Sequence, residues 1–195
     1  MTEKTMFDIR SKNIILTGSA GFLGTQFSHI LSNAGANVIL IDIENKKNKK
    51  LEKELIEKYH TVPQALSVDI SNPLDVKNSV KNILKNYGKI DALVNNAQFL
   101  PRTHHMRDTS FENYPFDLWN KTISKNLNGI FLCCKEIGSV MIKQSKGVIV
   151  NISSIYGIQG PDQRIYGDSR LNSPAFYSVT KGGIVNLTRY LAALW

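Results

Sequence analysis

The sequence is poor in cysteine and contains no long apolar run. Its two cysteines, Cys133 and Cys134, are adjacent, and neighbours on a helix point about 100° apart, so a disulfide scaffold is excluded. No apolar stretch reaches the ~18 residues that cross a membrane, and the charged start of the chain lacks the apolar core of a signal peptide. We therefore expect a soluble, reduced, cytoplasmic protein with no membrane partner.

Acidic residues are outnumbered by basic ones, 16 to 24, which gives a net charge of +8. Six of the lysines fall within residues 46–58, where Lys50–Glu54 and Lys53–Glu57 are oppositely charged pairs four residues apart. This spacing is typical of a solvated helix face. Because aromatic residues for base stacking do not accompany the lysines, no nucleic-acid partner is predicted.

Short apolar runs alternate with amphipathic stretches along all 195 residues. The predicted strands are Asn13–Thr17, Asn37–Asp42, Ala65–Asp69, Ala92–Asn95 and Val148–Ile152. The predicted helices lie near residues 21–34, 46–60, 73–87, 115–144 and 175–194. Such alternation predicts an α/β fold of one domain over residues 1–195, a Rossmann-like, doubly wound parallel sheet in three α/β/α layers.

The first predicted strand runs into a glycine-rich turn that is typical of dinucleotide binding. Its glycines allow a sharp turn and a close approach to phosphate, and the helix that follows offers free N–H groups to a pyrophosphate. The expected cofactor-binding residues of this turn are Gly18, Ser19, Ala20, Gly21, Phe22, Leu23 and Gly24. A tight strand–helix turn without a ligand is the alternative interpretation.

Asp42 ends the second predicted strand, about 20 residues after the glycines, where a carboxylate can accept hydrogen bonds from the adenosine ribose. A 2′-phosphate would be repelled there, and the next residues, Ile43 and Glu44, are not basic. These observations favour NAD over NADP. A solvated or helix-capping role for Asp42 is the alternative.

Tyr177 and Lys181 are four residues apart and project from one helix face. A tyrosine with a pKa near ~10 must be shifted by ~3 units, or about 4 kcal/mol, to act as a base near pH 7. One ammonium about 4 Å away supplies roughly that much at an effective dielectric constant of ~20. By spacing alone the pair is more typical of a surface helix, and its position after the fifth predicted strand favours the catalytic interpretation. Ser154, after the fifth predicted strand, lacks the surroundings of a hydrolase nucleophile but can bind a substrate oxygen.

Together these motifs resemble the short-chain dehydrogenase/reductase family over nearly the whole chain. The family's Asn-Asn-Ala-Gly turn has its counterpart in Asn95-Asn96-Ala97-Gln98, and its helix asparagine in Asn126. Its serine matches Ser154, and its Tyr-x-x-x-Lys motif matches Tyr177 and Lys181. The resemblance implies hydride transfer between a secondary alcohol or ketone and a bound nicotinamide cofactor.

The resemblance also implies roles for the matching residues. Tyr177 exchanges the proton on the substrate oxygen, Ser154 orients that oxygen, Lys181 lowers the pKa of Tyr177, and Asn126 positions a water that relays protons to Lys181. Further residues implied to contact the cofactor are Asp69, Ile70, Asn95, Asn96, Ala97, Tyr177 and Lys181. The resemblance implies a homo-oligomer for a full-length chain.

Three features depart from the family pattern. The spacing of Gly18, Gly21 and Gly24 resembles the family's longer branch, which includes nucleotide-sugar epimerases. Gln98 replaces a glycine, which would strain the backbone if φ were positive there. The interval between Ser154 and Tyr177 is longer than usual, as it is in oxidoreductases of flagellin modification and surface-glycan biosynthesis.

Polar and charged residues in two loops suggest a small polar substrate, such as a sugar, amino sugar or sugar phosphate. They are Arg102, His104, His105, Arg107, Asp162, Arg164, Asp168 and Arg170. No third ligand stands at a suitable distance from His104 and His105, so no metal site is predicted.

The helical pattern of residues 184–195 has neither a glycine cap nor a proline stop, and the last strands of the family are absent. We therefore expect a C-terminally incomplete chain. Two alternatives to an active dehydrogenase follow. One is an inactive dinucleotide-binding fragment or regulatory subunit, and the other is a nucleotide-sugar epimerase.

Overall fold

The computed structural model describes residues 8–101, 109–169 and 171–195. The strands are β1 (Asn13–Thr17), β2 (Asn37–Asp42), β3 (Gln64–Ser67), β4 (Ala92–Asn95) and β5 (Val148–Asn151). The α-helices are α1 (Phe22–Asn33), α2 (Asn45–Tyr59), α3 (Pro73–Tyr87), α4 (Phe116–Ile123), α5 (Gly129–Lys143) and α6 (Ala175–Leu194). The shorter helical turns are η2 (Phe111–Asn113), η3 (Ser124–Asn128), η4 (Ile155–Gly157) and η5 (Gln163–Ser169).

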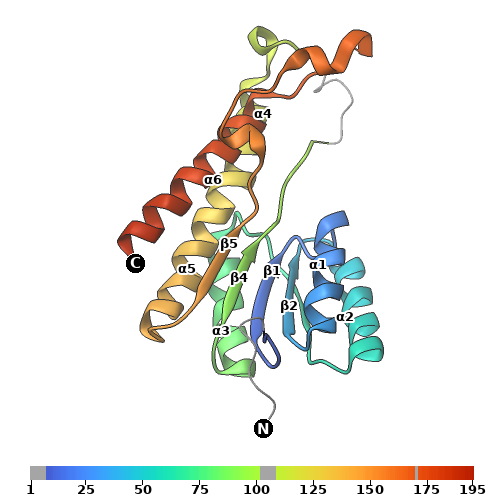
Figure 1. The fold of residues 1–195 in the computed structure, drawn as a ribbon, viewed down its shortest axis with the longest axis vertical. Helices are drawn as coiled ribbons and strands as arrows, with labels where there is room; N and C mark the ends of the chain where they lie inside the picture. Colours follow the sequence, from blue (N-terminus) through green and yellow to red (C-terminus); the bar gives the residue numbers. More distant parts are fainter. Residues whose placement is uncertain (1–7, 102–108, 170) are drawn as a thin grey trace. The chain divides into compact units, whose positions relative to one another are not determined.

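The five strands form one sheet in the order β3-β2-β1-β4-β5 (Figure 1). The strand β1 pairs in parallel with β2 and with β4, and β2 pairs in parallel with β3. Asn13 lies opposite Asn37 in the register, and Thr17 lies opposite Ile41. The strand order reverses beside β1, so the sheet is doubly wound, and the predicted Rossmann-like α/β fold is confirmed.

Helices cover the sheet on both faces because neighbouring residues of its strands point to opposite sides. Ile15 of β1 packs with Ile83 of α3 and Ile137 of α5 in one buried cluster. Leu16, the next residue of β1, packs with Leu51 and Leu55 of α2 on the other face. The predicted three layers are therefore present, and β1 is completely buried between them.

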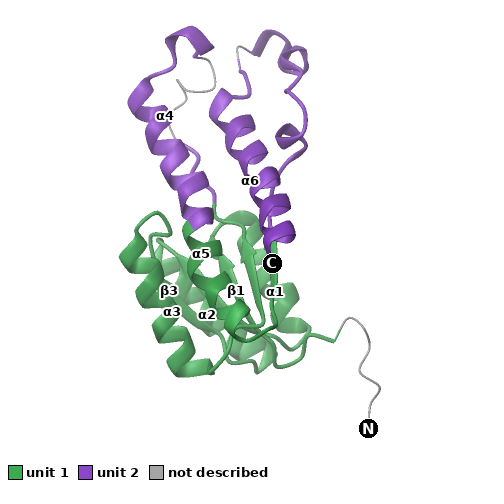
Figure 2. Cartoon of the chain, turned by 90° about the vertical axis from the view of Figure 1, so that its left-hand side faces the viewer, with its two compact units in different colours: residues 1–97, 132–150 green, residues 98–131, 151–195 purple. Residues whose placement is uncertain are grey.

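The chain divides into two compact units (Figure 2). Unit 1 comprises residues 1–97 and 132–150 and holds the sheet with its covering helices. Unit 2 comprises residues 98–131 and 151–195, in which α6 packs against η4, α4 and η3. In unit 2 the side chains of Phe176 and Ile184, on α6, are buried. The single domain expected over residues 1–195 stays a prediction.

The helix predicted over residues 115–144 is present but is interrupted by the π-helical turn η3, between α4 and α5. A π-turn contains one more residue than an α-turn and frequently marks a functional site. Asn126 lies within it. Within the described part of the chain, none of the helices combines the length and apolarity that crossing a bilayer requires.

Candidate active site

The glycine-rich turn between β1 and α1 is held in a shape that only glycine permits at two positions. Gly18 has φ = 68°, and a Cβ there would lie 2.6 Å from the Cα of Ala97. A Cβ on Gly24 would overlap the carbonyl oxygen of Gly18. The chain therefore needs Gly18 for the turn and Gly24 for the close packing of α1 on it.

The first turn of α1 is open to an anion. Gly21 caps the helix without a side-chain hydrogen bond, so the N–H groups at this positive helix end have no described side chain as partner. Phe22 and Leu23 are exposed beside it. Two other residues predicted to contact the cofactor already form hydrogen bonds within the protein. The Ser19 hydroxyl donates to Asn48 at 2.7 Å, and the Ala20 N–H donates to Asp42 at 2.9 Å. The turn fits a dinucleotide pyrophosphate through its backbone.

Asp42 lies at the end of β2, where its carboxylate faces the glycine turn. One oxygen accepts from the Ala20 N–H and the other accepts from the Glu44 N–H, both at 2.9 Å. Each carboxylate oxygen has a second lone pair, so Asp42 keeps the capacity to accept from a ribose hydroxyl. The structure thus fixes this charge in unit 1 beside the turn that fits the pyrophosphate.

The asparagines after β4 stabilise the same turn from the other side. The Thr17 hydroxyl accepts from the N–H groups of Asn96 and Ala97, each at 3.1 Å. The Asn96 side chain donates to the carbonyls of Thr17 and Gly18. Asn95 is buried, with its amide nitrogen 3.4 Å from the Cys134 sulfur. Both asparagine side chains are therefore engaged within the protein.

Gln98 does not introduce the strain that a positive φ would cause. Among the described residues other than glycine, only Ser11, His60 and Ser145 have positive φ. The replacement of the family's glycine by Gln98 is therefore compatible with the backbone at this position.

Asp69 and Ile70 follow β3 and differ in what they offer to a ligand. One Asp69 oxygen accepts from the Ser71 N–H at 3.0 Å and from the Ser71 hydroxyl at 2.7 Å. The Ile70 side chain is buried in the cluster on the α3 face of the sheet. A contact of Ile70 with adenine would thus be made by its backbone.

Asn126 is clamped within unit 2 by two hydrogen bonds to one residue. Its side-chain oxygen accepts from the Phe99 N–H at 2.6 Å, and its amide donates to the Phe99 carbonyl at 2.9 Å. The π-turn that holds Asn126 also packs against α6, where a Cβ on Gly183 would lie 3.0 Å from Leu127. Both polar atoms of the Asn126 side chain are thus engaged with Phe99, and its predicted role in positioning a water stays a prediction.

The segment after β5 is fastened to α6 beside Ser154. The Lys181 ammonium donates to the Ile152 carbonyl at 2.7 Å, and the Ser153 hydroxyl donates to the Lys181 carbonyl at 2.9 Å. Gly157 permits this approach, since a Cβ there would lie 2.7 Å from the Lys181 carbonyl oxygen. The Ser154 hydroxyl accepts from the Tyr156 N–H at 3.2 Å, so its own proton can be donated to a substrate oxygen.

Tyr177 lies in the same cluster. Its ring centroid is 5.8 Å from the Lys181 nitrogen and 6.3 Å from the ring of Tyr156, which meets it edge to face. Burial raises the pKa of Tyr156, and the neighbouring Tyr166, Asp162 and Tyr177 add to the rise. Tyr156 is therefore a weaker acid than a free tyrosine.

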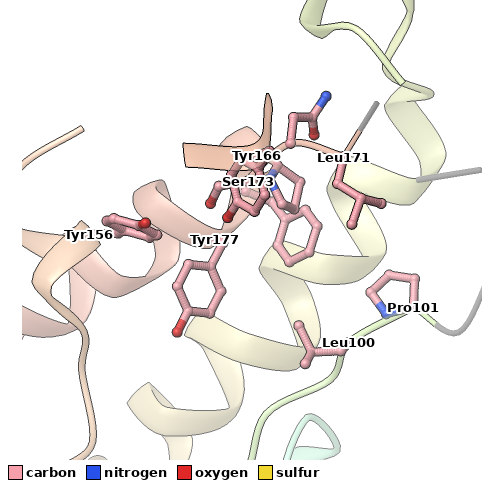
Figure 3. Close-up of a pocket in the computed structure, with 10 residues that line it drawn as sticks. Leu100, Pro101, Tyr156, Tyr166, Leu171, Ser173 and Tyr177 are labelled. Atoms are coloured by element: carbon pink, nitrogen blue, oxygen red, sulfur yellow. The ribbon is translucent and has the colours of Figure 1, made fainter. Parts of the chain in front are cut away.

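Tyr156 and Tyr177 also line a pocket of about 300 Å³ within unit 2 (Figure 3). Its other walls include Tyr166, Phe176, Leu100 and Pro101. None of the described loop charges predicted to contact substrate lines this pocket. Those charges are Asp162, Arg164 and Asp168, which are all exposed. The predicted Arg102, His104, His105, Arg107 and Arg170 lie outside the described residues.

The predicted site residues thus form two groups. The tetrad Asn126, Ser154, Tyr177 and Lys181 belongs to unit 2, and the residues of the glycine, Asp42, Asp69 and Asn95 segments belong to unit 1. The contact of Tyr177 and Lys181 with the cofactor stays a prediction. The described residues contain no group of three or more side chains suited to a metal ion.

Sequence reasoning missed several residues that build these groups. Thr17 and Asn48 hold the glycine turn, and Gly157 brings Ser154 to α6. The position of Thr17 directly before Gly18 and the small residues Gly182 and Gly183 directly after Lys181 were available signals. Tyr156 gave none, since a tyrosine two residues after a serine has no distinctive spacing.

The buried ammonium of Lys181 predicts a pH-dependent stability. Burial lowers its pKa from 10.5, so below that pH the unfolded chain binds the proton more tightly and stability falls as the pH falls. Lys181→Met removes this titration. The quantity compared is the melting temperature of the variant minus that of the unmodified chain. We expect this difference to be most positive at pH 7 and to decrease toward pH 10.5. Thermal unfolding monitored by circular dichroism measures the trend, and a pH-independent difference would contradict it.

Comparisons with known proteins identify similar sequences and a similar fold. Residues 12–195 match the family model described as short chain dehydrogenase. Over 184 residues the chain is 34% identical to the (2S)-[(R)-hydroxy(phenyl)methyl]succinyl-CoA dehydrogenase subunit BbsD of Thauera aromatica, a match that covers 94% of this chain and 67% of that protein. It is 32% identical to an NAD-dependent glycerol dehydrogenase of Listeria innocua, with 97% and 66% covered.

The fold is similar to that of an NAD⁺-bound xylitol dehydrogenase, with a TM-score of 0.83 at 26% identity. That match covers 95% of this chain and 65% of the other. The chain therefore spans about two thirds of the length of the proteins that it matches.

Proposed function

The chain belongs to the short-chain dehydrogenase/reductase family, and we propose that it transfers hydride between a secondary alcohol or ketone and a nicotinamide dinucleotide. The cofactor supplies the hydride chemistry when bound, and the protein supplies binding, orientation and proton transfer. The observation that carries the proposal is the cluster in unit 2, where Ser154, Tyr156, Tyr177 and Lys181 are joined by hydrogen bonds and ring contacts.

The four residues of the predicted tetrad have separate tasks in this mechanism. Tyr177 gives a proton to the substrate oxygen during reduction and takes it back during oxidation. Ser154 donates a hydrogen bond to the same oxygen and orients it. Lys181 holds a positive charge near the Tyr177 ring, which stabilises the phenolate left by proton transfer. Asn126 keeps the π-turn against the Phe99 segment through its two hydrogen bonds.

We further propose NAD as the cofactor, since the Asp42 carboxylate is fixed beside the glycine turn and would repel a 2′-phosphate. Asp42→Asn keeps an acceptor for the Ala20 N–H but removes the charge. The ratio of the NADPH to the NADH dissociation constant is expected to fall by about tenfold or more, as a close like-charge repulsion is lost. Titration of each cofactor followed by its fluorescence measures the ratio, and an unchanged ratio would refute the role of Asp42.

A sugar or amino-sugar substrate, with a place in flagellin or surface-glycan modification, is a narrower proposal. It depends on the loop charges, of which Asp162 and Arg164 form an ion pair with each other at 2.8 Å. The epimerase alternative depends only on the glycine spacing, and the two curated relatives named above are dehydrogenases. We therefore favour an alcohol or ketone substrate without specifying a sugar, and a homo-oligomer as the assembled form.

A further inference from the structure

The walls of the pocket beside Tyr177 are mostly rings and aliphatic side chains, with Asn172 and Ser173 as polar members. Tyr156, Tyr166, Tyr177 and Phe176 contribute four aromatic rings, and Leu100 and Pro101 contribute apolar surface (Figure 3). Aromatic walls bury large apolar areas and favour offset or edge-to-face contact with another ring. The volume of about 300 Å³ lies at the lower end of the range for small-molecule sites, roughly 300–1,000 Å³.

Two described residues of the interval between Ser154 and Tyr177, Gln163 and Ser173, hydrogen-bond each other reciprocally. The side chain of Gln163 donates to the Ser173 carbonyl at 3.2 Å and accepts from the Ser173 N–H at 3.0 Å. This reciprocal pair closes the segment on itself. Tyr166, within it, lies beside Tyr156, whose ring contacts Tyr177. The aromatic walls are therefore supported by contacts of their own and are formed before a ligand binds.

The described charged side chains of this segment do not line the pocket. Asp162 and Arg164 pair with each other, and the side chain of Arg164 is 91% exposed. Among the described residues, those that line the pocket carry no formal charge.

One polar atom in the wall has no partner among the described residues. Asn172 lines the pocket, and its amide nitrogen donates to the Thr109 carbonyl at 3.0 Å. Its side-chain oxygen is buried and accepts no hydrogen bond from the part of the chain that the structure describes. A buried acceptor of this kind costs free energy unless a ligand supplies a donor.

We propose that this pocket takes an apolar ring of the substrate, alicyclic or aromatic, and that Asn172 accepts a hydrogen bond from a donor on that ring. The inference rests on the proposed function, because the reacting carbon must lie next to Tyr177. It specifies the substrate class as a ring-bearing ketone or secondary alcohol, in place of a sugar phosphate. Tyr166 and Tyr156 are then specificity-determining residues.

Equilibrium binding to the full chain tests this pocket without relying on turnover. The probes are 2-tetralone, a fused-ring ketone, and dihydroxyacetone phosphate, a small charged ketone, titrated in the presence of NAD⁺, which cannot reduce a ketone. We expect 2-tetralone to bind at least tenfold more tightly. Equal binding, or tighter binding of the phosphate, would overturn the proposal.

Two variants and a matched control locate the binding site. Tyr166→Ala removes one wall, and Leu171→Asp places a charge at a lining position that is exposed enough to leave folding intact. Each is expected to weaken 2-tetralone binding about tenfold, whereas Tyr190→Ala, at an exposed site of α6 outside the pocket, should change it less than twofold. If Leu171→Asp binds 2-tetralone as tightly as the unmodified chain, the ring does not bind in this pocket. This conclusion holds even if Tyr166→Ala fails to fold.

The role of Asn172 is tested by adding one donor to the probe. A hydroxyl on the aromatic ring of 2-tetralone is expected to tighten binding about fivefold, and Asn172→Leu should remove that gain. If the gain persists in Asn172→Leu, the proposed hydrogen bond to Asn172 is overturned.

Failure of the inference is distinguishable from failure of the proposed function. Turnover of dihydroxyacetone phosphate without 2-tetralone binding overturns only the ring pocket. Binding of 2-tetralone that depends on Tyr166, with hydride transfer that does not depend on Tyr177, overturns only the proposed chemistry.

Discussion

Replacing Tyr177 by Phe is expected to lower kcat/KM about 1,000-fold while NADH affinity stays within about threefold. The substitution removes the only phenol of the cluster that we assign to proton exchange, and a positioned acid or base contributes 10² to 10⁴ in rate. The ring of Tyr177, with its contacts to Tyr156 and Lys181, is retained in Phe. Steady-state oxidation of NADH with a ketone substrate measures the first quantity, and fluorescence titration measures the second.

Tyr156→Phe is the informative control for this experiment. Tyr156 meets the ring of Tyr177 edge to face but is not assigned to proton exchange, so the loss of its hydroxyl should cost less than tenfold in kcat/KM. Loss of turnover in Tyr156→Phe with turnover retained in Tyr177→Phe would transfer the proton-exchange role to Tyr156. NADH binding by the unmodified chain with no turnover of any ketone or alcohol would favour the inactive dinucleotide-binding alternative.

The strand–helix order was predictable because buried parallel strands and amphipathic helices leave different patterns in sequence. The strand β1 reads as an unbroken apolar run since both its faces are covered, and β2 reads likewise. The glycine turn was also accessible, because backbone crowding between Gly18 and Ala97 and between Gly24 and Gly18 tolerates no side chain. Local constraints of this kind determine the residue type at single positions, so they can be read from the sequence.

The π-turn around Asn126 was not predictable. One additional residue per turn shifts the helix face only locally, so the apolar pattern of residues 116–143 remains compatible with one uninterrupted α-helix. The two hydrogen bonds between Asn126 and Phe99 join residues 27 apart in the sequence. No spacing rule links such a pair.

The character of the pocket was hidden for a different reason. Charged loop residues draw attention in a sequence, yet Asp162 and Arg164 are two residues apart and neutralise each other on the surface. Tyr166 and Phe176, which do line the pocket, are indistinguishable in sequence from ordinary core aromatics. Which of these residues meet a ligand is decided by tertiary contacts such as that between Gln163 and Ser173.

The second large effect is expected from Gly24→Ala, which we predict to destabilise unit 1 by about 3 kcal/mol, since overpacking against fixed atoms costs roughly 1–3 kcal/mol or more. The new methyl group would overlap the Gly18 carbonyl oxygen, a backbone atom that cannot rotate away. Either α1 or the turn must then move, which displaces the helix N-terminus that fits the pyrophosphate. We expect the melting temperature to fall by roughly 6–12 °C and NADH affinity to fall at least tenfold.

Two other glycines provide a graded comparison for this prediction. A Cβ on Gly21 would lie 3.2 Å from the Gly18 oxygen, a contact that a shift of a few tenths of an ångström relieves, so Gly21→Ala should cost less than Gly24→Ala. A Cβ on Gly160 would meet no atom within 4 Å, so Gly160→Ala should change stability by less than about 0.5 kcal/mol. Thermal unfolding and NADH titration of all three variants should give this order. If Gly24→Ala melts and binds like Gly160→Ala, the turn is not packed against α1 as described, and its fit to a dinucleotide loses its structural basis.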